Sequence, residues 1–168
     1  MKGDTKMNFD SREFRNTMGR FSTGVTVITV KEGGEIHGMT ANSFSSVSLE
    51  PPIISICIDH RAKCLDLISK AGYFGVNFLK TEQINISKLF ANQKVEVKPE
   101  VSFKVTEEGV PLLDDALTNL NCKVVNEVEV GDHTVFFGEV LGLKNNEGSP
   151  LCFFQGKYRQ LAENEAVV

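Results

Sequence analysis

The chain has 168 residues and a formal net charge of −4, which excludes nucleic-acid binding as its main role, because such domains need a basic face. Hydrophobic residues make up 41% of the chain, as in a soluble globular protein, and no apolar run approaches the roughly 20 residues that span a membrane. We therefore expect one soluble domain over residues 1–168, with no linker long enough to divide it.

The first elements predicted along the chain are a short helix and a hairpin. Asp10 and Glu13 have the spacing of an N-cap and its capping box, and apolar residues at helical spacing continue to Gly19, which ends the helix. The β-branched residues 25–30 predict a strand. A glycine turn follows, and a second strand begins near Ile36, so we expect the two strands to form a hairpin.

Strands and short helices alternate through the middle of the chain. The apolar residues 53–58 predict a buried strand, and residues 74–79 predict another. Residues 62–71 and 82–90 carry apolar side chains at helical spacing, which predicts a short helix after each strand. Residues 92–100 are rich in charge and include a proline, so they predict an exposed connection.

The last third of the chain predicts a long hairpin and a final strand over residues 151–154. Apolar and polar residues alternate from Leu120, break at Val125, turn at Gly131 and return over residues 134–143. The break indicates a twist, a bulge or a face buried against a partner. Together the elements predict a mostly β protein with short helices, arranged as an antiparallel barrel. These patterns alone do not distinguish a split barrel from an OB-type barrel.

Cysteines and histidines are too scattered to predict a disulfide framework or a metal site. None of the four cysteines forms a CxxC pair, and the three histidines match no zinc spacing. Cys57 and Cys122 fall in apolar runs, where a thiol acts as a small buried side chain. The polar residues 1–6 lack the apolar core of a signal peptide. We therefore expect a cytoplasmic protein without a metal.

Residues 40–48 differ in composition from an ordinary turn. They carry five hydroxyl side chains, one carboxamide and one aromatic ring, with almost no charge. Small side chains let a ligand reach backbone N–H and C=O groups, so this composition favours a binding segment for a polar heterocycle. A serine-rich turn between strands is the alternative. The motifs of NTP hydrolysis, Rossmann binding and zinc proteolysis are absent, which fits chemistry done by a bound cofactor.

Residues 40–52 resemble the signature of the flavin reductase-like family, the small FMN-binding split barrels. The resemblance covers nearly the whole chain, with further motifs at residues 14–29, 131–134 and 153–159. It is strongest for the small reductase components of two-component phenol and 4-hydroxyphenylacetate hydroxylases. It implies an antiparallel split β-barrel, a homodimer, and an NAD(P)H:flavin oxidoreductase that reduces FMN or FAD. A partner monooxygenase would then receive the reduced flavin.

Two alternatives remain open beside this reductase. One is a flavoprotein electron carrier or ferric reductase on the same barrel, and the other is a flavin-binding module without turnover. Turnover of NADH with excess free flavin would separate the reductase from the module. No side chain is implied as catalytic, because the flavin performs the hydride chemistry and the protein binds and orients it.

The resemblance also implies where the flavin is bound. Residues 40–44 and 46–47 would line the isoalloxazine edge and the ribityl chain. The flavin phosphate would lie where the strand over residues 53–58 meets the next helix, at Arg61 and Lys63. Many relatives have Ser-x-Thr at this position, whereas this chain has Ala62 and Cys64. The two cations and the free N–H groups of the helix start would replace those hydroxyls, since a helix start favours anions.

The remaining implied contacts lie further along the chain. Phe90 would close over the flavin, and His133 would reach the nicotinamide cofactor, while Tyr158 and its neighbours would offer stacking and charge to the dinucleotide. The alternatives are a core phenylalanine, a solvated histidine at a hairpin tip and a barrel-edge aromatic. The full set of implied cofactor-binding residues is Thr40, Ala41, Asn42, Ser43, Phe44, Ser46, Val47, Arg61, Ala62, Lys63, Cys64, Phe90, His133, Lys157, Tyr158 and Arg159.

Overall fold

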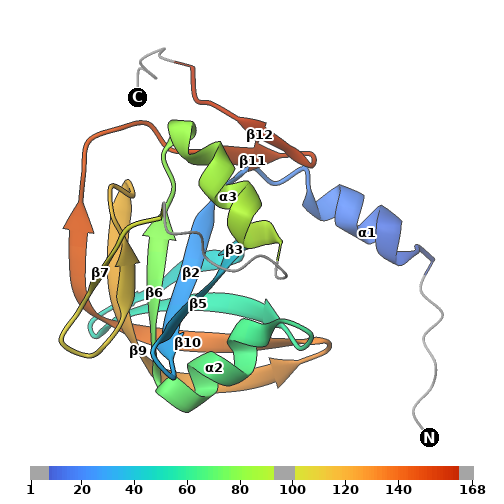
Figure 1. The fold of residues 1–168 in the computed structure, drawn as a ribbon. Coiled ribbons are helices and arrows are strands. Elements are labelled where there is room, and N and C mark those ends of the chain that lie inside the picture. Colours follow the sequence, from blue (N-terminus) through green and yellow to red (C-terminus); the bar gives the residue numbers. More distant parts are fainter. Residues whose placement is uncertain (1–7, 93–100, 163–168) are drawn as a thin grey trace, which may run out of the picture.

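A seven-stranded antiparallel sheet forms the body of the protein in a computed structural model, which describes residues 8–92 and 101–162 (Figure 1). Its strands are β2 (Thr26–Glu32), β3 (Glu35–Ala41), β4 (Phe44–Leu49), β5 (Pro52–Asp59), β6 (Tyr73–Phe78), β9 (Thr118–Val130) and β10 (His133–Asn145). They lie in the spatial order β3-β2-β6-β9-β10-β5-β4. The prediction of a mostly β chain with antiparallel strands is confirmed. The connection predicted over residues 92–100 lies, apart from its first residue, outside the described residues.

Two small sheets and three α-helices complete the described part of the fold. The sheets are formed by β1 (Thr23–Gly24), β11 (Cys152–Phe154) and β12 (Lys157–Arg159), and by β7 (Phe103–Val105) and β8 (Pro111–Leu113). The helices are α1 (Ser11–Met18), α2 (Lys63–Ala71) and α3 (Ile84–Ala91), with a 3₁₀ turn η1 (Thr81–Gln83) before α3. None of the described helices is long and apolar enough to cross a membrane.

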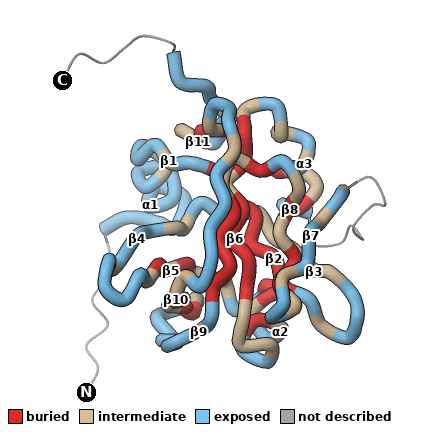
Figure 2. Tube along the Cα trace, turned by 90° about the vertical axis from the view of Figure 1, so that its left-hand side faces the viewer, coloured by how far each residue is buried: buried red, intermediate tan, exposed pale blue. Residues whose placement is uncertain are grey.

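Alternating side chains on β5 separate the interior of the sheet from its outer face. Ile54, Ile56 and Ile58 are buried in the core, whereas Ser55 and Cys57 between them are half-buried on the opposite face. The most deeply buried backbone follows β2 and β6 through the middle of the molecule (Figure 2). Small polar side chains therefore lie on the outer face of β5, where a ligand can reach them.

A buried asparagine ties β6 to the strands around it. Asn77 Nδ2 donates to the carbonyl oxygen of Val27 at 2.8 Å. Its Oδ1 accepts from the backbone N–H of Leu113 at 2.8 Å and from Asn119 Nδ2 at 2.8 Å. Because Asn77 is fully buried, these partners satisfy a polar side chain that would otherwise oppose folding. The network fixes β8, which the sequence patterns did not predict, against β2 and β9.

The break in the alternation at Val125 is a β-bulge. Phe137 pairs with Asn126 and Gly138 pairs with Val124, which leaves Val125 without a partner in the β9–β10 register. The extra residue bends β9, and the residues beyond it are exposed along most of their length. Of the three interpretations of this break, the bulge is therefore confirmed.

The edges of the large sheet are β3 and β4. In sequence they are separated only by the corner Asn42-Ser43. No ladder joins the two strands in residues 8–92 and 101–162, so the described structure shows an open antiparallel sheet and not a closed barrel. The corner thus lies at the opening between the two edges.

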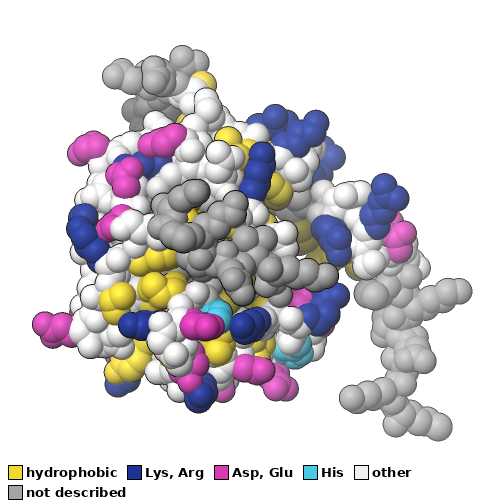
Figure 3. Space-filling view, in the orientation of Figure 1, with side chains coloured by type: hydrophobic (Ala, Val, Ile, Leu, Met, Phe, Trp, Pro, Cys, Tyr) yellow, Lys and Arg dark blue, Asp and Glu magenta, His cyan; other side chains and the backbone are white. Residues whose placement is uncertain are grey.

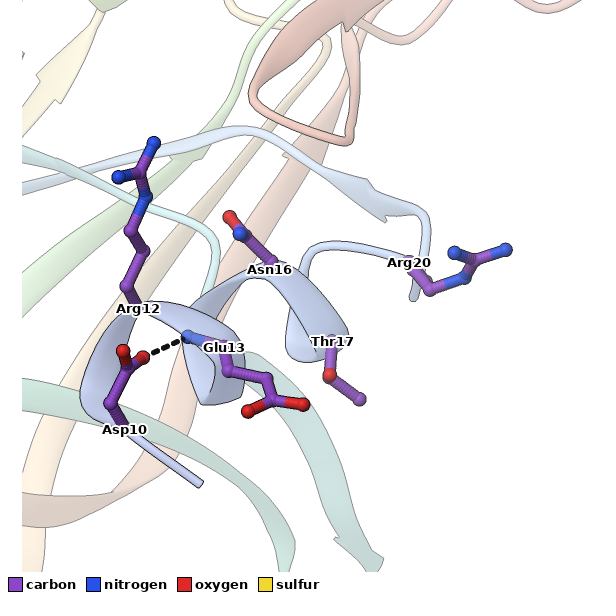
Figure 4. Close-up of a pocket in the computed structure, with 6 residues that line it drawn as sticks. All are labelled: Asp10, Arg12, Glu13, Asn16, Thr17 and Arg20. Atoms are coloured by element: carbon purple, nitrogen blue, oxygen red, sulfur yellow. Dashed lines mark hydrogen bonds between the residues drawn. The ribbon is translucent and has the colours of Figure 1, made fainter. Parts of the chain in front are cut away.

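Helix α1 projects from the body of the protein and buries none of its own residues (Figure 1). The predicted N-cap is confirmed, because Asp10 Oδ1 accepts a hydrogen bond from Glu13 N at 2.7 Å (Figure 4). Phe14 and Met18 remain 51% and 53% exposed on one side of the helix. The polar side borders a shallow depression of about 280 Å³ that also includes Arg20.

Candidate functional site

Residues 40–48 form strand ends and a corner, not a turn. Thr40 and Ala41 end β3, residues 44–49 form β4, and only Asn42 and Ser43 lie outside the strands. The serine-rich composition concealed β4, because hydroxyl residues other than threonine are poor strand formers. An edge strand tolerates them, since its side chains pack against one neighbouring strand only.

A cavity of about 580 Å³ opens beside this corner. The strands β1, β4 and β5 supply two residues each. The corner, the start of β2, the end of β6 and the segments next to β1, β6, β9 and β11 supply the rest. The lining residues are Phe21, Thr23, Gly24, Val25, Thr26, Asn42, Ser43, Phe44, Ser45, Ser55, Cys57, Phe78, Leu79, Leu117, Pro150 and Leu151. The cavity therefore brings together the N-terminal segment, the corner and the outer face of β5.

The cavity lining combines two kinds of side chain. Small polar side chains come from the corner and from β5, whereas Leu79, Leu117 and Leu151 are apolar. Leu79 and Leu151 are buried and pack in one hydrophobic cluster with Val25. A ligand with a flat apolar body and a polar edge matches such a mixed lining.

Some of the predicted hydroxyl contacts hold the corner together. Ser43 Oγ donates to the carbonyl oxygen of Cys57 at 2.8 Å and accepts from its N–H at 3.2 Å. Thr40 Oγ1 donates to the carbonyl oxygen of Ser87 at 2.7 Å, so its side chain faces α3 and does not line the cavity. These two hydroxyls therefore position the backbone for a ligand, and they are not themselves available as donors.

Other polar groups at the cavity have no partner inside the protein. The side chain of Asn42 makes no hydrogen bond with any described residue and lines the cavity. Thr23 Oγ1 is inaccessible to solvent and has no hydrogen-bond partner among the described residues. Asn42 is exposed at the corner and is able to bind a polar ligand edge, whereas the Thr23 hydroxyl oxygen is closed off from the cavity.

Arg61 follows β5 and is held by an ion pair. Its Nε donates to Asp59 Oδ1 at 2.9 Å and its Nη2 to Asp59 Oδ2 at 2.5 Å. The hydrogen bonds from the Arg61 side chain and backbone hold the pKa of Asp59 well below its usual value. The Arg61 side chain is 88% exposed, so one side of the guanidinium still faces solvent.

The start of α2 offers backbone donors but not the side chains expected there. Ala62 is the N-cap and makes no side-chain cap, and Lys63 is the first helical residue. Ala62 and Cys64 are both buried in the core, and burial raises the pKa of the Cys64 thiol to about 11. Their side chains do not reach a cofactor at this position. The Ala62 N–H already donates to the carbonyl oxygen of Asp59 at 2.8 Å, so only the backbone N–H of Cys64 is left for the predicted contact.

His133 lies next to Asp59, although the two residues are far apart in the sequence. It is the first residue of β10 and pairs with Asp59 in the β5–β10 register. Its Nδ1 lies 2.7 Å from Asp132 Oδ1, and this contact lowers the pKa of Asp132. Arg61 and His133 are thus brought together around Asp59, outside the cavity.

Phe90 belongs to the core, as its alternative stated, and Tyr158 is half-buried and packs against the edge of the same hydrophobic cluster. Phe90 is buried against β3, where a Cβ added at Gly38 would lie 2.7 Å from its ring. The Tyr158 hydroxyl lies 2.9 Å from Ser87 Oγ, and its ring packs edge-on against Phe153. Neither ring lines the cavity, so the expected contacts of Phe90 with a flavin and of Tyr158 with a dinucleotide are not supported by their positions.

Lys157 and Arg159 are exposed on β12, whereas Tyr158, which lies between them in the sequence, is half-buried. Lys and Arg side chains gather over the β11–β12 hairpin and along α1 on the face shown in Figure 3. β12 pairs with β11, which pairs in turn with β1 at the cavity wall. Strand β11 therefore separates the two cations on β12 from β1, the strand that borders the cavity.

Most of the cavity wall was not predicted as site residues, and only Asn42, Ser43 and Phe44 of the predicted set line it. Ser55 and Cys57 alternate with buried isoleucines on β5, and this alternation is a readable signal for a polar outer face. Phe21 and Thr23 follow the end of α1, and no local pattern connects them with the corner. Only the pairing of β1 with β11 and the position of Leu151 bring them to the cavity.

The flavin reductase like domain family matches residues 18–162 of the chain. An NADH-dependent flavin reductase of a Rhodococcus species is 41% identical over 150 residues, which are 88% of this chain and 84% of the relative. The solved structure of flavin reductase PheA2 is 48% identical, with a TM-score of 0.87 over 92% of this chain and all of that one. The NADH:FAD oxidoreductase SgcE6 of Streptomyces globisporus, solved with NAD and FAD fragments, is 36% identical, with a TM-score of 0.88 over 94% of this chain and 96% of that one. Other relatives are named as reductase components of monooxygenases.

Proposed function

The chain belongs to the flavin reductase like family, and we propose that it is an NADH-dependent flavin reductase that supplies reduced flavin to a partner monooxygenase. The observation that carries this proposal is the cavity at the corner Asn42-Ser43, formed by the segment that resembles the family signature. The family match over residues 18–162 also supports one domain for the whole chain, with the split-barrel architecture.

The cavity fits an isoalloxazine ring. Its volume of about 580 Å³ lies within the roughly 300–1,000 Å³ of small-molecule pockets. The leucine wall suits the flat apolar part of the ring. Asn42 is exposed and makes no side-chain hydrogen bond within the described residues, so it supplies a polar group for the heterocycle edge.

The outer face of β5 leads from the cavity to a phosphate site. Ser55, Cys57 and Asp59 share this face, and the path from Ser55 to Asp59 is about 13 Å for four extended residues. A ribityl chain that follows this path would bring its phosphate to Arg61. Lys63 and the uncapped N–H groups of α2 add positive potential at the same point. FMN and FAD both carry this phosphate, so the proposal covers both.

The nicotinamide cofactor has two candidate contacts. His133 is exposed at the hairpin tip beside Arg61, and its imidazole is able to hydrogen-bond the carboxamide or stack on the ring. Lys157 and Arg159 carry positive charge close to β1 and are suited to the phosphates of the dinucleotide. We propose that NADH contacts both regions.

The protein contributes binding, orientation and exclusion of water to the reaction. When bound, a flavin accepts a hydride from NADH at its N5 atom. Leu79 and Leu151 give the cavity buried apolar lining that excludes water, and the corner would hold the ring edge against its backbone. No acid–base pair lines the described cavity, so proton transfer by a side chain plays no part in this proposal.

Exposed apolar side chains support a homodimer. Phe14 and Met18 on α1, Leu49 on β4, and Val128 and Val130 on β9 are all more than 40% exposed. Large exposed apolar surfaces mark protein interfaces, and a second copy of the same chain is the commonest partner. Sedimentation velocity at micromolar concentration tests this part of the proposal, and a monomer would contradict it.

The central experiment is NADH oxidation by purified protein with excess free FMN, FAD or riboflavin. Multiple turnovers per protein molecule support the reductase. Flavin binding without NADH oxidation would support the module instead. Electron transfer to ferric complexes, with the flavin bound to the protein throughout, would support the electron carrier or ferric reductase. We also propose the cytoplasm as the compartment, since all four cysteines are free thiols and reducing conditions preserve them.

A further inference from the structure

Phe21 places an exposed aromatic ring in the cavity wall. It lines the cavity, yet it is 78% exposed to solvent. Three other apolar residues of the same wall, Val25, Leu79 and Leu151, are instead buried in the core. An aromatic ring left this open beside a cavity offers its surface to a ligand, and a planar ligand would cover it.

Backbone hydrogen bonds on both sides of Phe21 fix the position of this segment beside the cavity. Its N–H donates to the carbonyl oxygen of Met18 at 3.0 Å, in the turn that ends α1. The carbonyl oxygen of Gly19 accepts from the N–H of Gln155 at 2.8 Å, which ties the turn to the β11–β12 hairpin. The segment is thus held at both ends, because two residues later Thr23 pairs with Phe153.

Small polar side chains line the same cavity. Asn42, Ser43 and Ser45 of the corner and of β4 share the lining with Phe21 and leave room beside the backbone. The side chain of Asn42 is exposed and makes no hydrogen bond within the described residues. An open aromatic ring and small polar side chains in one lining suit a planar ligand with a polar edge.

We infer that Phe21 packs its ring against the isoalloxazine ring and forms the outer cover of the flavin site. This inference rests on the proposed function. The contact involves the tricyclic ring alone, so it is the same for lumiflavin, riboflavin and FMN. It therefore differs from the contact at Arg61, which depends on the phosphate. Covering one ring face also leaves the opposite face as the approach for the nicotinamide.

The test compares Phe21→Ala and Phe21→Trp with wild-type protein by flavin fluorescence titration. Loss of one stacking contact weakens binding by about tenfold, and we expect this loss for lumiflavin, riboflavin and FMN alike. Phe21→Trp should restore most of the affinity. Phe9→Ala is the matched control, since Phe9 is a 45% exposed phenylalanine that does not line the cavity.

Three results would overturn the inference. They are unchanged affinity in Phe21→Ala, a loss confined to FMN, and an equal loss in Phe9→Ala. Sedimentation of each variant is measured in parallel, and a loss of affinity that occurs only with dissociation of a dimer would assign Phe21 to the subunit interface. If wild-type protein binds no flavin, the proposed function itself fails, whereas wild-type binding with an unaffected Phe21→Ala variant rejects this contact alone.

Discussion

The hydroxyl of Ser43 is bonded to both backbone groups of Cys57, with distances of 2.8 Å to the carbonyl oxygen and 3.2 Å to the amide nitrogen. The backbone carbonyl of Ser43 accepts from the same Cys57 N–H at 3.3 Å. A single residue thus fastens the corner to β5 at the point where both line the cavity. These hydrogen bonds fix the position of the backbone of the corner that lines the cavity.

Ser43→Ala should loosen the corner without removing a ligand contact. The loss of two partly buried hydrogen bonds should lower the free energy of unfolding by about 1–2 kcal/mol. If about 1 kcal/mol of this free energy is also lost from the flavin complex, flavin affinity should fall about fivefold. Urea denaturation and flavin titration measure the two effects. Ser48→Ala is the control, because Ser48 does not line the cavity and makes no side-chain hydrogen bond within the described part of the chain.

Arg61→Ala should weaken FMN more than riboflavin. A charge-assisted hydrogen bond to phosphate contributes about 1.5–3 kcal/mol, so FMN affinity should fall by roughly one to two decades. Riboflavin has no phosphate and should lose little. Lys63→Ala tests the second cation in the same way. If both ligands lose the same affinity, the two residues support the structure and do not contact phosphate.

Most of the fold was predictable because local patterns and tertiary packing agree. The run of β-branched residues at 25–30 became β2, and the break at Val125 became a bulge. The strand β4 was missed because its serines lack strand propensity, and an edge position tolerates them. β8 was missed for a different reason, since it is held by the side chain of Asn77, far away in the sequence.

The candidate site was predictable only where one continuous segment forms it. Asn42 and Ser43 lie at the cavity as the signature implied, whereas Thr40 turns toward α3. Phe90 packs into the core because Gly38 leaves space for its ring. Phe21 reaches the cavity through the pairing of β1 with β11, a contact between distant segments that a pattern of neighbouring residues does not contain.

Asn77→Ala should destabilise the fold strongly. The substitution removes the hydrogen-bond partner of the Leu113 N–H and of the Val27 carbonyl in a buried site, and Asn119 loses one of its two acceptors. The free energy of unfolding should fall by about 3 kcal/mol, measured by urea denaturation. Asn126→Ala replaces an exposed asparagine on β9 and should change stability by less than about 0.5 kcal/mol. Similar losses in the two variants would contradict the importance of the network.

Stability should decline at alkaline pH because of two buried thiols. Burial raises the pKa of Cys64 to about 11 and that of Cys122 to about 12, from a usual value of 9.0. Above pH 9 the unfolded chain loses these protons while the native protein keeps them, so the free energy of unfolding falls as pH rises. At pH 10 each thiol should account for about 1 kcal/mol of this decline. Urea denaturation at pH 7 and pH 10 measures the difference. It should shrink in Cys64→Ala, although that variant is less stable at both pH values, and an undiminished difference would refute the assignment.

His133→Ala should separate nicotinamide binding from flavin binding. His133 lies outside the flavin cavity and next to Asp59, so its removal leaves the corner and the cavity wall unchanged. Loss of one contact of about 1–2 kcal/mol should raise the KM for NADH by roughly 5–30-fold, with flavin affinity nearly intact. Steady-state kinetics at saturating flavin and a separate flavin titration give the two values. An unchanged KM, or a parallel collapse of flavin binding, would reject this role. Lys157→Ala and Arg159→Ala would then become the decisive variants, because their exposed cations lie on the strand next to β11.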